Sequence, residues 1–282
     1  MQNAHPHEGA GLPFARPRYI NLPDPDQIAD LAGEFASGDP FPHLVLRDRL
    51  NLSPEKLLPH FPSPEWDGWH RFTDQYQHHK LACAEPERIP LLPGMIIQEM
   101  SAPGFLRFIE QVTGIGKLIP DPYLKGGGLH CSGGNGVLAP HTDFHFYHDL
   151  GLFRRVNVLL YLTDNWDESC GGAFGLWRRK EEKPARLVVP AWGTMVIFRT
   201  DDQSVHGFAT PVREGRWRRS IAMYYYTSEE AEAYSGDTTT YWRRHGELQG
   251  VRRLRLFAYR AALYGSRVFS IIAHYANPHV KG

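Results

Sequence analysis

The sequence predicts a mainly β fold, a sandwich or barrel-like core with flanking helices. From residue 123 onward, short strand-like segments alternate with glycine-rich and polar turns. The strongest of them, residues 155–162, is nearly all apolar on one face, with Asn157 as the exception. Segments with helical periodicity lie outside this stretch, before residue 114 and after residue 250. Regularly spaced short strands with turns between them are typical of all-β sandwiches and barrels, here with helices placed before the core.

The individual elements follow from hydrophobic periodicity and from cap and turn residues. Ser53-Pro54 is a good helix start, and Gly114 is well placed for a helix stop. Helices are expected at residues 26–37, 53–59 and 94–113, the last interrupted at 102–104. Strands are expected at residues 41–46, 155–162, 173–177, 185–189, 194–199, 206–211 and 219–227. Residues 133–136 indicate a tight turn, whereas residues 66–80 fit either a strand or a loop over a pocket.

The pattern divides the chain into three parts. Residues 1–40 are expected to form a leader and a short helix, residues 41–227 the main domain, and residues 228–282 a helical extension. Within the extension, residues 251–275 carry arginines on one side and apolar residues on the other. This pattern indicates helices packed on the domain or on a second copy in a homodimer. A basic amphipathic surface that touches anionic lipid or a lipid-linked substrate is the alternative.

Composition and charge exclude several classes of protein. Lys plus Arg and Asp plus Glu both number 31, so no global field recruits nucleic acid. Three widely separated cysteines make neither a disulfide framework nor a CxxC metal site, which predicts a cytoplasmic protein. The first residues lack the apolar stretch of a secretory signal, and no apolar run is long enough for a membrane span.

A candidate metal site begins with His141-Thr142-Asp143. In an extended segment, a His and an Asp two residues apart point to the same face. His206, placed in a later strand region, is the expected third ligand. Two imidazoles and one carboxylate that leave positions open form the ligand set of non-haem Fe(II) sites. His145 and His148 lie close enough in the sequence to compete as ligands, and we favour a supporting role for His145.

A candidate carboxylate-binding pair follows His206. On an extended strand, Arg218 and Ser220 share one face while Arg219 points oppositely. A guanidinium with a nearby hydroxyl suits the far carboxylate of a dicarboxylate whose other end chelates the metal. A register slip of one residue would make Arg219 the partner instead.

These motifs resemble the 2-oxoglutarate/Fe(II)-dependent dioxygenase superfamily, and most of all its bacterial prolyl-4-hydroxylase-like branch. The resemblance extends over roughly residues 41–227. It rests on Gly126-Gly127-Gly128-Leu129-His130, His141-Thr142-Asp143-Phe144, Arg155-Val156-Asn157-Val158-Leu159-Leu160-Tyr161-Leu162, Gly171-Gly172, His206-Gly207 and Arg218-Arg219-Ser220-Ile221-Ala222-Met223-Tyr224-Tyr225-Tyr226-Thr227.

The resemblance implies a double-stranded β-helix (jelly-roll) core. It also implies that His141, Asp143 and His206 bind Fe(II) and that Arg218, with Ser220, holds the distal carboxylate of 2-oxoglutarate, with O2 as the other cosubstrate. Two further candidate contacts to the cosubstrate are His130 and Asn157, although Asn157 fits a hydrogen-bonded core residue equally well. Ascorbate is a further candidate cofactor.

For the activity, we expect hydroxylation of a small organic or sugar-containing metabolite, as in specialised-metabolite biosynthesis. Aromatic residues near the expected entrance (Trp66, Trp69, Tyr76 and Tyr147) favour such a substrate. Peptidyl-prolyl hydroxylation of a protein is the alternative, and Ala173 after the paired glycines, where collagen-type enzymes carry an acidic residue, argues against a collagen-like peptide. A jelly-roll protein that binds metal or sugar without redox chemistry is the alternative of another class.

Overall fold

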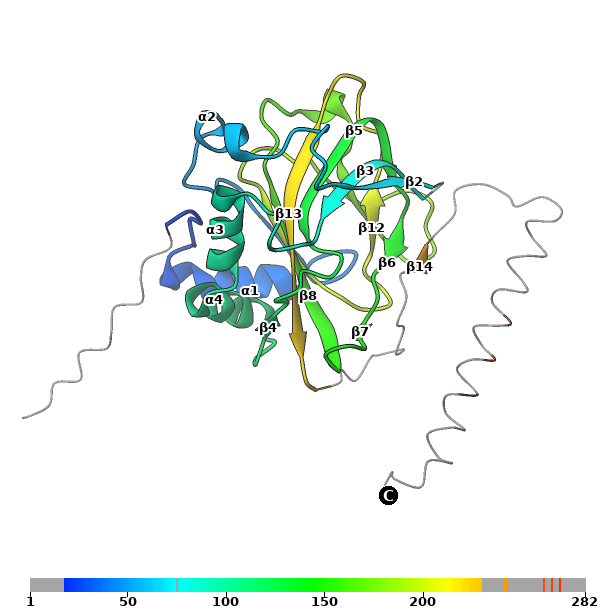
Figure 1. Ribbon diagram of the computed structural model, residues 1–282. Coiled ribbons are helices and arrows are strands. Elements are labelled where there is room, and N and C mark those ends of the chain that lie inside the picture. Colours follow the sequence, from blue (N-terminus) through cyan, green and yellow to red (C-terminus); the bar gives the residue numbers. More distant parts are fainter. Residues whose placement is uncertain are drawn as a thin grey trace, which may run out of the picture. The chain divides into compact units, whose positions relative to one another are not determined.

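Two antiparallel sheets form the core of the computed structural model (Figure 1). The larger sheet has nine strands. Its order is β1 (His43–Leu46), β11 (Met195–Arg199), β8 (Leu152–Tyr161), β13 (Arg218–Thr227), β5 (Gly128–Leu138), β3 (Gln77–Cys83) and β2 (His70–Thr73), with β4 (Ile119–Pro120) on β13 and β7 (Phe146–Tyr147) on β8. The smaller sheet has the order β10 (Arg186–Val188), β9 (Phe174–Trp177), β12 (Val205–Phe208), β6 (His141–Thr142) and β14 (Tyr241–Trp242). This is the mainly β, jelly-roll core with flanking helices that the sequence predicted.

The structure describes residues 18–74, 76–229 and 241–242, together with positions 261, 265 and 269. Residues 1–243 make up one unit and residues 244–282 a second. Most of the expected C-terminal helical extension and of the N-terminal leader lies outside the described residues; positions 261, 265 and 269 are helical. No helix among the described residues is long and apolar enough to cross a membrane.

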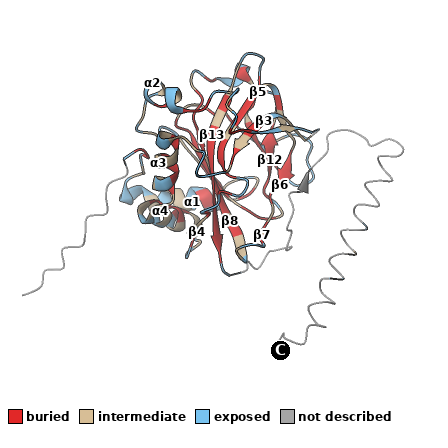
Figure 2. Cartoon of the chain, in the orientation of Figure 1, coloured by how far each residue is buried: buried red, intermediate tan, exposed pale blue. Residues whose placement is uncertain are grey.

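The two central strands of the larger sheet, β8 and β13, separate a hydrophobic face from a functional one. Successive side chains of a strand point to opposite faces. On β8, Val156, Val158 and Leu160 are fully buried in the core shared with the helices (Figure 2). The alternate residues, Asn157 and Tyr161, point between the two sheets and are just as inaccessible. The space between the sheets is therefore where polar side chains are gathered.

Within residues 18–229, four α-helices alternate with the first strands of the larger sheet. They are α1 (Ile28–Ala36), α2 (Pro54–Leu57, continued by the 3-10 turn Leu58–His60), α3 (Leu91–Met100) and α4 (Pro103–Thr113); single 3-10 turns lie at Pro25–Gln27 and Glu168–Cys170. The interruption expected at 102–104 divides the helical region into α3 and α4, because Pro103 cannot continue α3 and instead opens α4 at its first position. Gly114 ends α4 with the left-handed φ of 69° that glycine tolerates best.

One segment settles an alternative that the sequence left open, and another differs from expectation. Residues 66–80 contribute to a β-hairpin, because β2 pairs with β3 from His70↔Ala82 to Thr73↔His78. A tight turn was expected at residues 133–136. These residues do not reverse the chain but form a bulge inside β5. Between the pairs His78↔Val137 and Lys80↔Ser132, four residues of β5 face only His79 of β3. Glycines allow this bulge because a Cβ at 134 would lie 2.7 Å from the Glu214 backbone.

Candidate metal centre

Three buried side chains converge between the sheets at the sequence-predicted site. His141, Asp143 and His206 each offer a ligand atom, and these atoms lie within 4.8 Å of one another. The two histidines come from neighbouring strands of the smaller sheet, where His206 of β12 pairs directly with His141 of β6. Asp143 comes directly after β6 and two residues after His141, so its side chain returns to the same face. It is the one cluster with metal-ligand geometry within the described part of the chain.

The backbone sets the proton positions of both histidines. His141 Nδ1 lies 2.9 Å from the carbonyl oxygen of Ala139, and His206 Nδ1 lies 2.8 Å from that of Ser204. A carbonyl oxygen only accepts, so in each ring Nδ1 carries the hydrogen and Nε2 presents its lone pair. Burial, reinforced by His141, lowers the pKa of His206 to about 3, which keeps that ring neutral. Two neutral imidazoles fixed in this way fit a divalent metal.

Two side chains hold the carboxylate of Asp143. Arg154 Nη2 and Asn157 Nδ2 donate to Asp143 Oδ2 at 2.8 and 2.7 Å. The other oxygen, Oδ1, lies 3.6 Å from His141 Nε2 and is the one left to bind a metal. Arg154 and Asn157 form a clamp on Asp143, and this clamp is itself fixed by hydrogen bonds. Arg154 Nε donates to Asn157 Oδ1 at 2.7 Å, and Thr200 Oγ1 donates to the same oxygen at 3.2 Å. Asp143 is therefore oriented before any metal binds.

The clamp also keeps Asp143 ionised in a buried place. Burial alone raises the pKa of this carboxyl, but Arg154 and the two histidine ligands together lower it well below its ordinary value. Arg154 is 1% exposed, and its guanidinium lies 3.3 Å from the ring centroid of Tyr224 and 4.9 Å from that of Phe144. A buried charge of this kind is retained where its partner is fixed and its hydrogen bonds are satisfied. The donor set therefore fits Fe(II), with an anionic oxygen and two nitrogens on one side.

A buried arginine lies on the neighbouring wall. Arg218, at the start of β13, is 5% exposed. Its Nε donates to the carbonyl oxygen of Gly172 at 2.9 Å and its Nη2 to the Tyr161 hydroxyl at 3.0 Å. The guanidinium lies over the ring of Phe208, 4.2 Å from its centroid. Its remaining nitrogen, Nη1, bonds to no other described residue, which leaves donors for a ligand carboxylate.

The register decides between the two arginines. Arg218 and Ser220 both lie on the inward face, and both are buried. Arg219 lies on the other face, where its Nη1 contacts the Trp217 carbonyl oxygen at 3.5 Å. Gly172 permits the approach of Arg218, because its φ is +60° and a Cβ there would lie 3.1 Å from Arg218 Cδ. The pair Arg218 and Ser220 faces the metal ligands, and Arg219 does not.

The other candidate residues take different places. His130 lies on the inward face of β5, paired with Ser220, and its Nε2 donates to the Gly126 carbonyl oxygen at 3.1 Å. Burial, reinforced by Lys80, lowers its pKa to about 3. Asn157 touches Asp143 rather than the Arg218 wall. His145 is fully buried with Nδ1 3.6 Å from Asp202, outside the ligand cluster, and His148 is exposed.

Three of the expected entrance aromatics are part of the core instead. Trp69 is 6% exposed, donates its Nε1 hydrogen to the Ser63 carbonyl oxygen at 2.7 Å, and packs edge-on against Trp66. Tyr147 is 4% exposed and lies against Tyr226. They therefore give no support to a particular substrate.

Arg154 and Tyr161 are the residues that sequence reasoning missed. A charged residue at the start of the strongest apolar strand was the available sign of the first.

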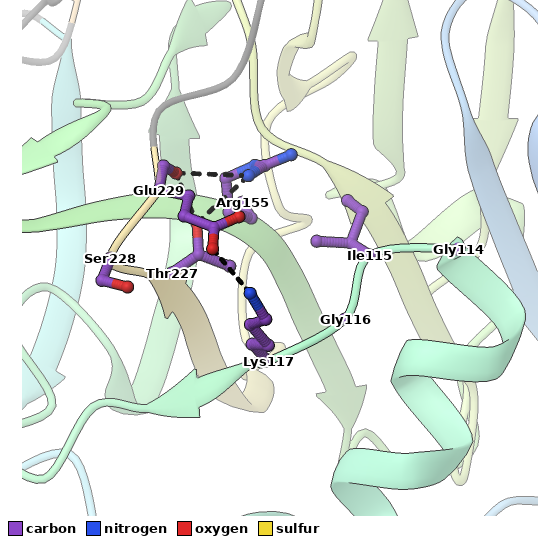
Figure 3. Close-up of a pocket in the computed structure, with 8 residues that line it drawn as sticks. All are labelled: Gly114, Ile115, Gly116, Lys117, Arg155, Thr227, Ser228 and Glu229. Atoms are coloured by element: carbon purple, nitrogen blue, oxygen red, sulfur yellow. Dashed lines mark hydrogen bonds and ion pairs between the residues drawn. The ribbon is translucent and has the colours of Figure 1, made fainter.

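A separate pocket of about 180 Å³ lies where β13 ends (Figure 3). Its polar groups are already matched: Lys117 Nζ lies 2.6 Å from Glu229 Oε1, and Arg155 Nη1 donates to Thr227 Oγ1 at 3.1 Å. None of the metal ligands lines it. We interpret these contacts as the link that holds the end of β13 to the loop after α4.

Comparison with known proteins places the site in a family. A family model described as the 2OG-Fe(II) oxygenase superfamily matches residues 127–226. The chain is 30% identical over 91 residues to the prolyl 3-hydroxylase OGFOD1 of Xenopus laevis, covering 30% of this chain and 18% of that protein. It is 24% identical over 200 residues to the prolyl 3,4-dihydroxylase OGFOD1 of Ostreococcus tauri, covering 68% of this chain and 37% of that protein. The matches thus span well under half of either relative.

A solved structure with a similar fold is a prolyl hydroxylase from Trichoplax adhaerens, in complex with a peptide fragment of the hypoxia inducible factor oxygen degradation domain. It has a TM-score of 0.49 at 15% identity and covers 71% of this chain and 89% of that one. The segment matched by the family model contains the three metal-ligand candidates and Arg218. Over residues 127–226, which contain the candidate site, this chain is therefore similar to the 2OG-Fe(II) oxygenase superfamily.

Proposed function

We propose that the protein is a 2-oxoglutarate- and Fe(II)-dependent dioxygenase that hydroxylates an organic substrate. One observation carries the proposal: a buried arginine with free donors lies on the wall next to a buried His-Asp-His cluster. The cluster alone fits several metals, and the arginine alone fits any anion. Together they match a cosubstrate with one chelating end and one distal carboxylate.

Each side chain has a role that follows from its contacts. His141, His206 and Asp143 would hold the metal and, as only three protein ligands, would leave coordination positions for 2-oxoglutarate and O2. Arg154 and Asn157 keep Asp143 ionised and oriented. Arg218, positioned by Tyr161, binds the distal carboxylate. When bound, the metal and cosubstrate supply O2 activation coupled to decarboxylation of 2-oxoglutarate to succinate and CO2.

Anaerobic spectroscopy tests the cosubstrate site directly. Purified protein given Fe(II) and 2-oxoglutarate is expected to develop the metal-to-ligand charge-transfer band of a chelated complex, and His206→Ala is expected to lose it. Arg218→Met and Arg219→Met form a matched pair on opposite faces of one strand. Loss of a charge-assisted carboxylate contact weakens 2-oxoglutarate binding by about 10- to 100-fold in Arg218→Met only. An equal effect in Arg219→Met contradicts the assignment.

Prolyl hydroxylation is the second candidate activity, because both curated relatives carry prolyl hydroxylase names. A small organic or sugar-containing metabolite remains the first candidate from the sequence. Succinate release distinguishes them: a panel of small metabolites and a panel of proline-containing peptides are compared at equal concentration, with His206→Ala as the blank. A protein that binds Mn(II) but forms no succinate with either panel and no charge-transfer band would be a non-redox metal-binding jelly roll.

A further inference from the structure

Lys80 lies on the same inward face as the cosubstrate site, two strands away from Arg218. It pairs with Ser132 of β5, and Ser132 pairs in turn with Arg218 of β13. Residues paired directly across antiparallel strands point to the same face of a sheet. Lys80, Ser132 and Arg218 therefore form one row across the larger sheet. β3 lies beyond β5, next to the edge strand β2 (Figure 1).

The Lys80 ammonium group is only partly matched by the fold. It has three donors, and among the described residues it forms one hydrogen bond, to Gln77 Oε1 at 2.9 Å. The ring of Phe72 lies 5.1 Å from Nζ and adds a cation–π contact. Over residues 18–74 and 76–229, no carboxylate forms an ion pair with it. A desolvated lysine with donors to spare favours an anionic ligand.

The charges around Lys80 are consistent with this. Burial lowers its pKa to about 8, an effect that Asp143 opposes and Arg218 reinforces, with Asp74 opposing it from the turn before β3. Asp143 is already committed to Arg154 and to the metal site. His130, on β5 two residues before Ser132, is neutral at its lowered pKa of about 3 and gives no compensating charge.

Lys80 lies apart from the groups to which Arg218 is bonded. Hydrogen bonds to Tyr161 and Gly172 turn the Arg218 guanidinium toward β8 and β9, away from β3. Arg218 is 5% exposed, whereas Lys80 is half-buried and keeps contact with solvent. Gln77, at the start of β3, fixes the ammonium on the hairpin side of the sheet. A ligand that reaches Lys80 therefore enters along the β2–β3 hairpin.

Formal charges lead to the same side. In the proposed complex the two charges of the metal match those of 2-oxoglutarate, and Asp143 matches Arg154. Arg218 and Lys80 remain, and neither forms an ion pair with a carboxylate over residues 18–74 and 76–229, although the charge of Asp74 acts on Lys80 from the turn before β3. With Arg218 assigned to the cosubstrate, Lys80 is the cation left for a second anionic ligand.

We propose that Lys80 binds a carboxylate of the primary substrate and so selects acidic substrates. The proposal rests on the proposed function, since it assumes that the Arg218 wall takes the cosubstrate. Lys80 acts as a specificity-determining residue that holds the substrate's anionic end, at the hairpin side, while the rest of the molecule extends toward the metal ligands.

Site-resolved amine labelling tests this without knowledge of the substrate. The Ni(II)-loaded protein is treated with limiting acetic anhydride, and acetylation of Lys80 is measured by mass spectrometry against Lys183 on an exposed turn. The probes are acetate and benzoate, with acetamide and benzamide as neutral matches, each with and without saturating 2-oxoglutarate. A carboxylate at Nζ raises the pKa of Lys80 by about one unit and slows its labelling about tenfold at neutral pH. Lys183 is expected to stay unchanged.

Each outcome decides the proposal. Slower labelling with acetate or benzoate in the presence of 2-oxoglutarate, and not with the amides, supports it. Protection by 2-oxoglutarate alone, with no further effect of the probes, assigns Lys80 to the cosubstrate and overturns it. Absence of protection by either carboxylate overturns it as well.

A calorimetric titration separates this inference from the proposed function. 2-Oxoglutarate is expected to bind Lys80→Met within about twofold of the unmodified protein, and Arg218→Met about 10- to 100-fold more weakly. If 2-oxoglutarate binds none of the three proteins, the proposed function fails while the labelling result still stands. Lys80→Arg, which keeps the cation, should retain any preference for acids over amides in succinate release, and Lys80→Met should lose it.

Discussion

The His-Asp-His cluster (the metal end of the inward face) and Lys80 near the β2–β3 hairpin (the hairpin end) differ in how completely the fold satisfies their polar groups. At the metal end, Asp143 receives hydrogen bonds from Arg154 and Asn157, and each histidine ligand has its Nδ1 hydrogen on a backbone carbonyl. At the hairpin end, Lys80 has one hydrogen bond, to Gln77. Arg218 lies between these extremes, with two of its nitrogens bonded.

This difference distinguishes the groups that hold the metal from the groups that discriminate between ligands. Groups that must hold one geometry in every turnover are fixed by the protein itself, because preorganised ligands need no rearrangement when the metal binds. Groups that must distinguish between ligands keep free donors, because an unsatisfied polar group penalises a ligand that cannot pair with it. The gradient from Asp143 to Lys80 thus predicts where substitutions change stability and where they change selectivity.

The largest change in unfolding free energy is expected at the metal end, where the polar groups are fully hydrogen-bonded. Arg154→Met leaves the Asp143 carboxylate buried without its cation, which costs about 3–5 kcal/mol of unfolding free energy. Urea unfolding of the metal-free protein measures it as a lower midpoint at an unchanged slope. Arg155→Met is the matched control, because Arg155 bonds to Thr227 at the surface end of β13. Equal losses in the two variants would show that the clamp is not a special feature of the metal end.

Metal binding at the His-Asp-His cluster is expected to stabilise the protein. At a concentration 100 times its dissociation constant, Mn(II) adds about 2.7 kcal/mol to the unfolding free energy. Mn(II) is the suitable probe because it binds isolated histidines weakly, so the unfolded chain competes little. Thermal denaturation should show the rise in the unmodified protein and in His78→Ala, a hairpin histidine outside the cluster, but not in His206→Ala or Asp143→Ala. A rise in His206→Ala would mean that the metal binds elsewhere.

Much of this gradient was visible in the sequence, for physical reasons. His141 and Asp143 share a face through strand periodicity, and Arg218 and Ser220 share one in the same way. The alternation of β8 and β13 is strong because one face packs on helices, so the register that favours Arg218 over Arg219 is determined by hydrophobic burial. The predicted fold class and metal cluster depended on such local periodicities.

What the sequence did not show depends on contacts between distant strands. Arg154 reaches Asp143 where the pairing of β8 with β13 shifts register, because Val156 pairs with Tyr225 and Arg154 with Tyr226 while Arg155 is skipped. Lys80 joins the row of Arg218 through two strand pairings. The bulge at residues 133–136 sets the register of that pairing, and its glycines instead predicted a chain reversal. Long-range pairing is what local patterns lack.

The intermediate position of Arg218 predicts an intermediate effect at Gly172. Gly172→Ala forces a side chain into a φ of +60° and against Arg218 Cδ, at a cost of about 1–3 kcal/mol. Because Arg218 must shift, 2-oxoglutarate binding is expected to weaken as well, by about tenfold. Calorimetric titration measures this against Gly151→Ala, at a positive φ of 63° with open space around it. Loss of stability in both variants with loss of binding only in Gly172→Ala fits the geometry; unchanged binding contradicts it.

The smallest effect, and one of opposite sign, is expected at Lys80. Its pKa is lowered by burial to about 8, so the charged form is less favourable in the folded protein than in the unfolded chain. The penalty is complete below that pH, declines as the pH rises toward the ordinary lysine value near 10.4, and is absent above it. Lys80→Met should therefore raise the unfolding free energy by on the order of 1 kcal/mol at neutral pH, and this gain should vanish at high pH.

Unfolding curves measured across this pH range, with Lys80→Arg as the control that keeps the cation, distinguish charge from packing. A gain that is independent of pH would come from the packing of the methionine and would remove the argument that the fold leaves Lys80 under-matched. A gain that fades through the lysine titration means that the protein carries a cation at a cost to its own stability. Such a cost is retained where a ligand offsets it, and for Lys80 that ligand is the carboxylate of the substrate.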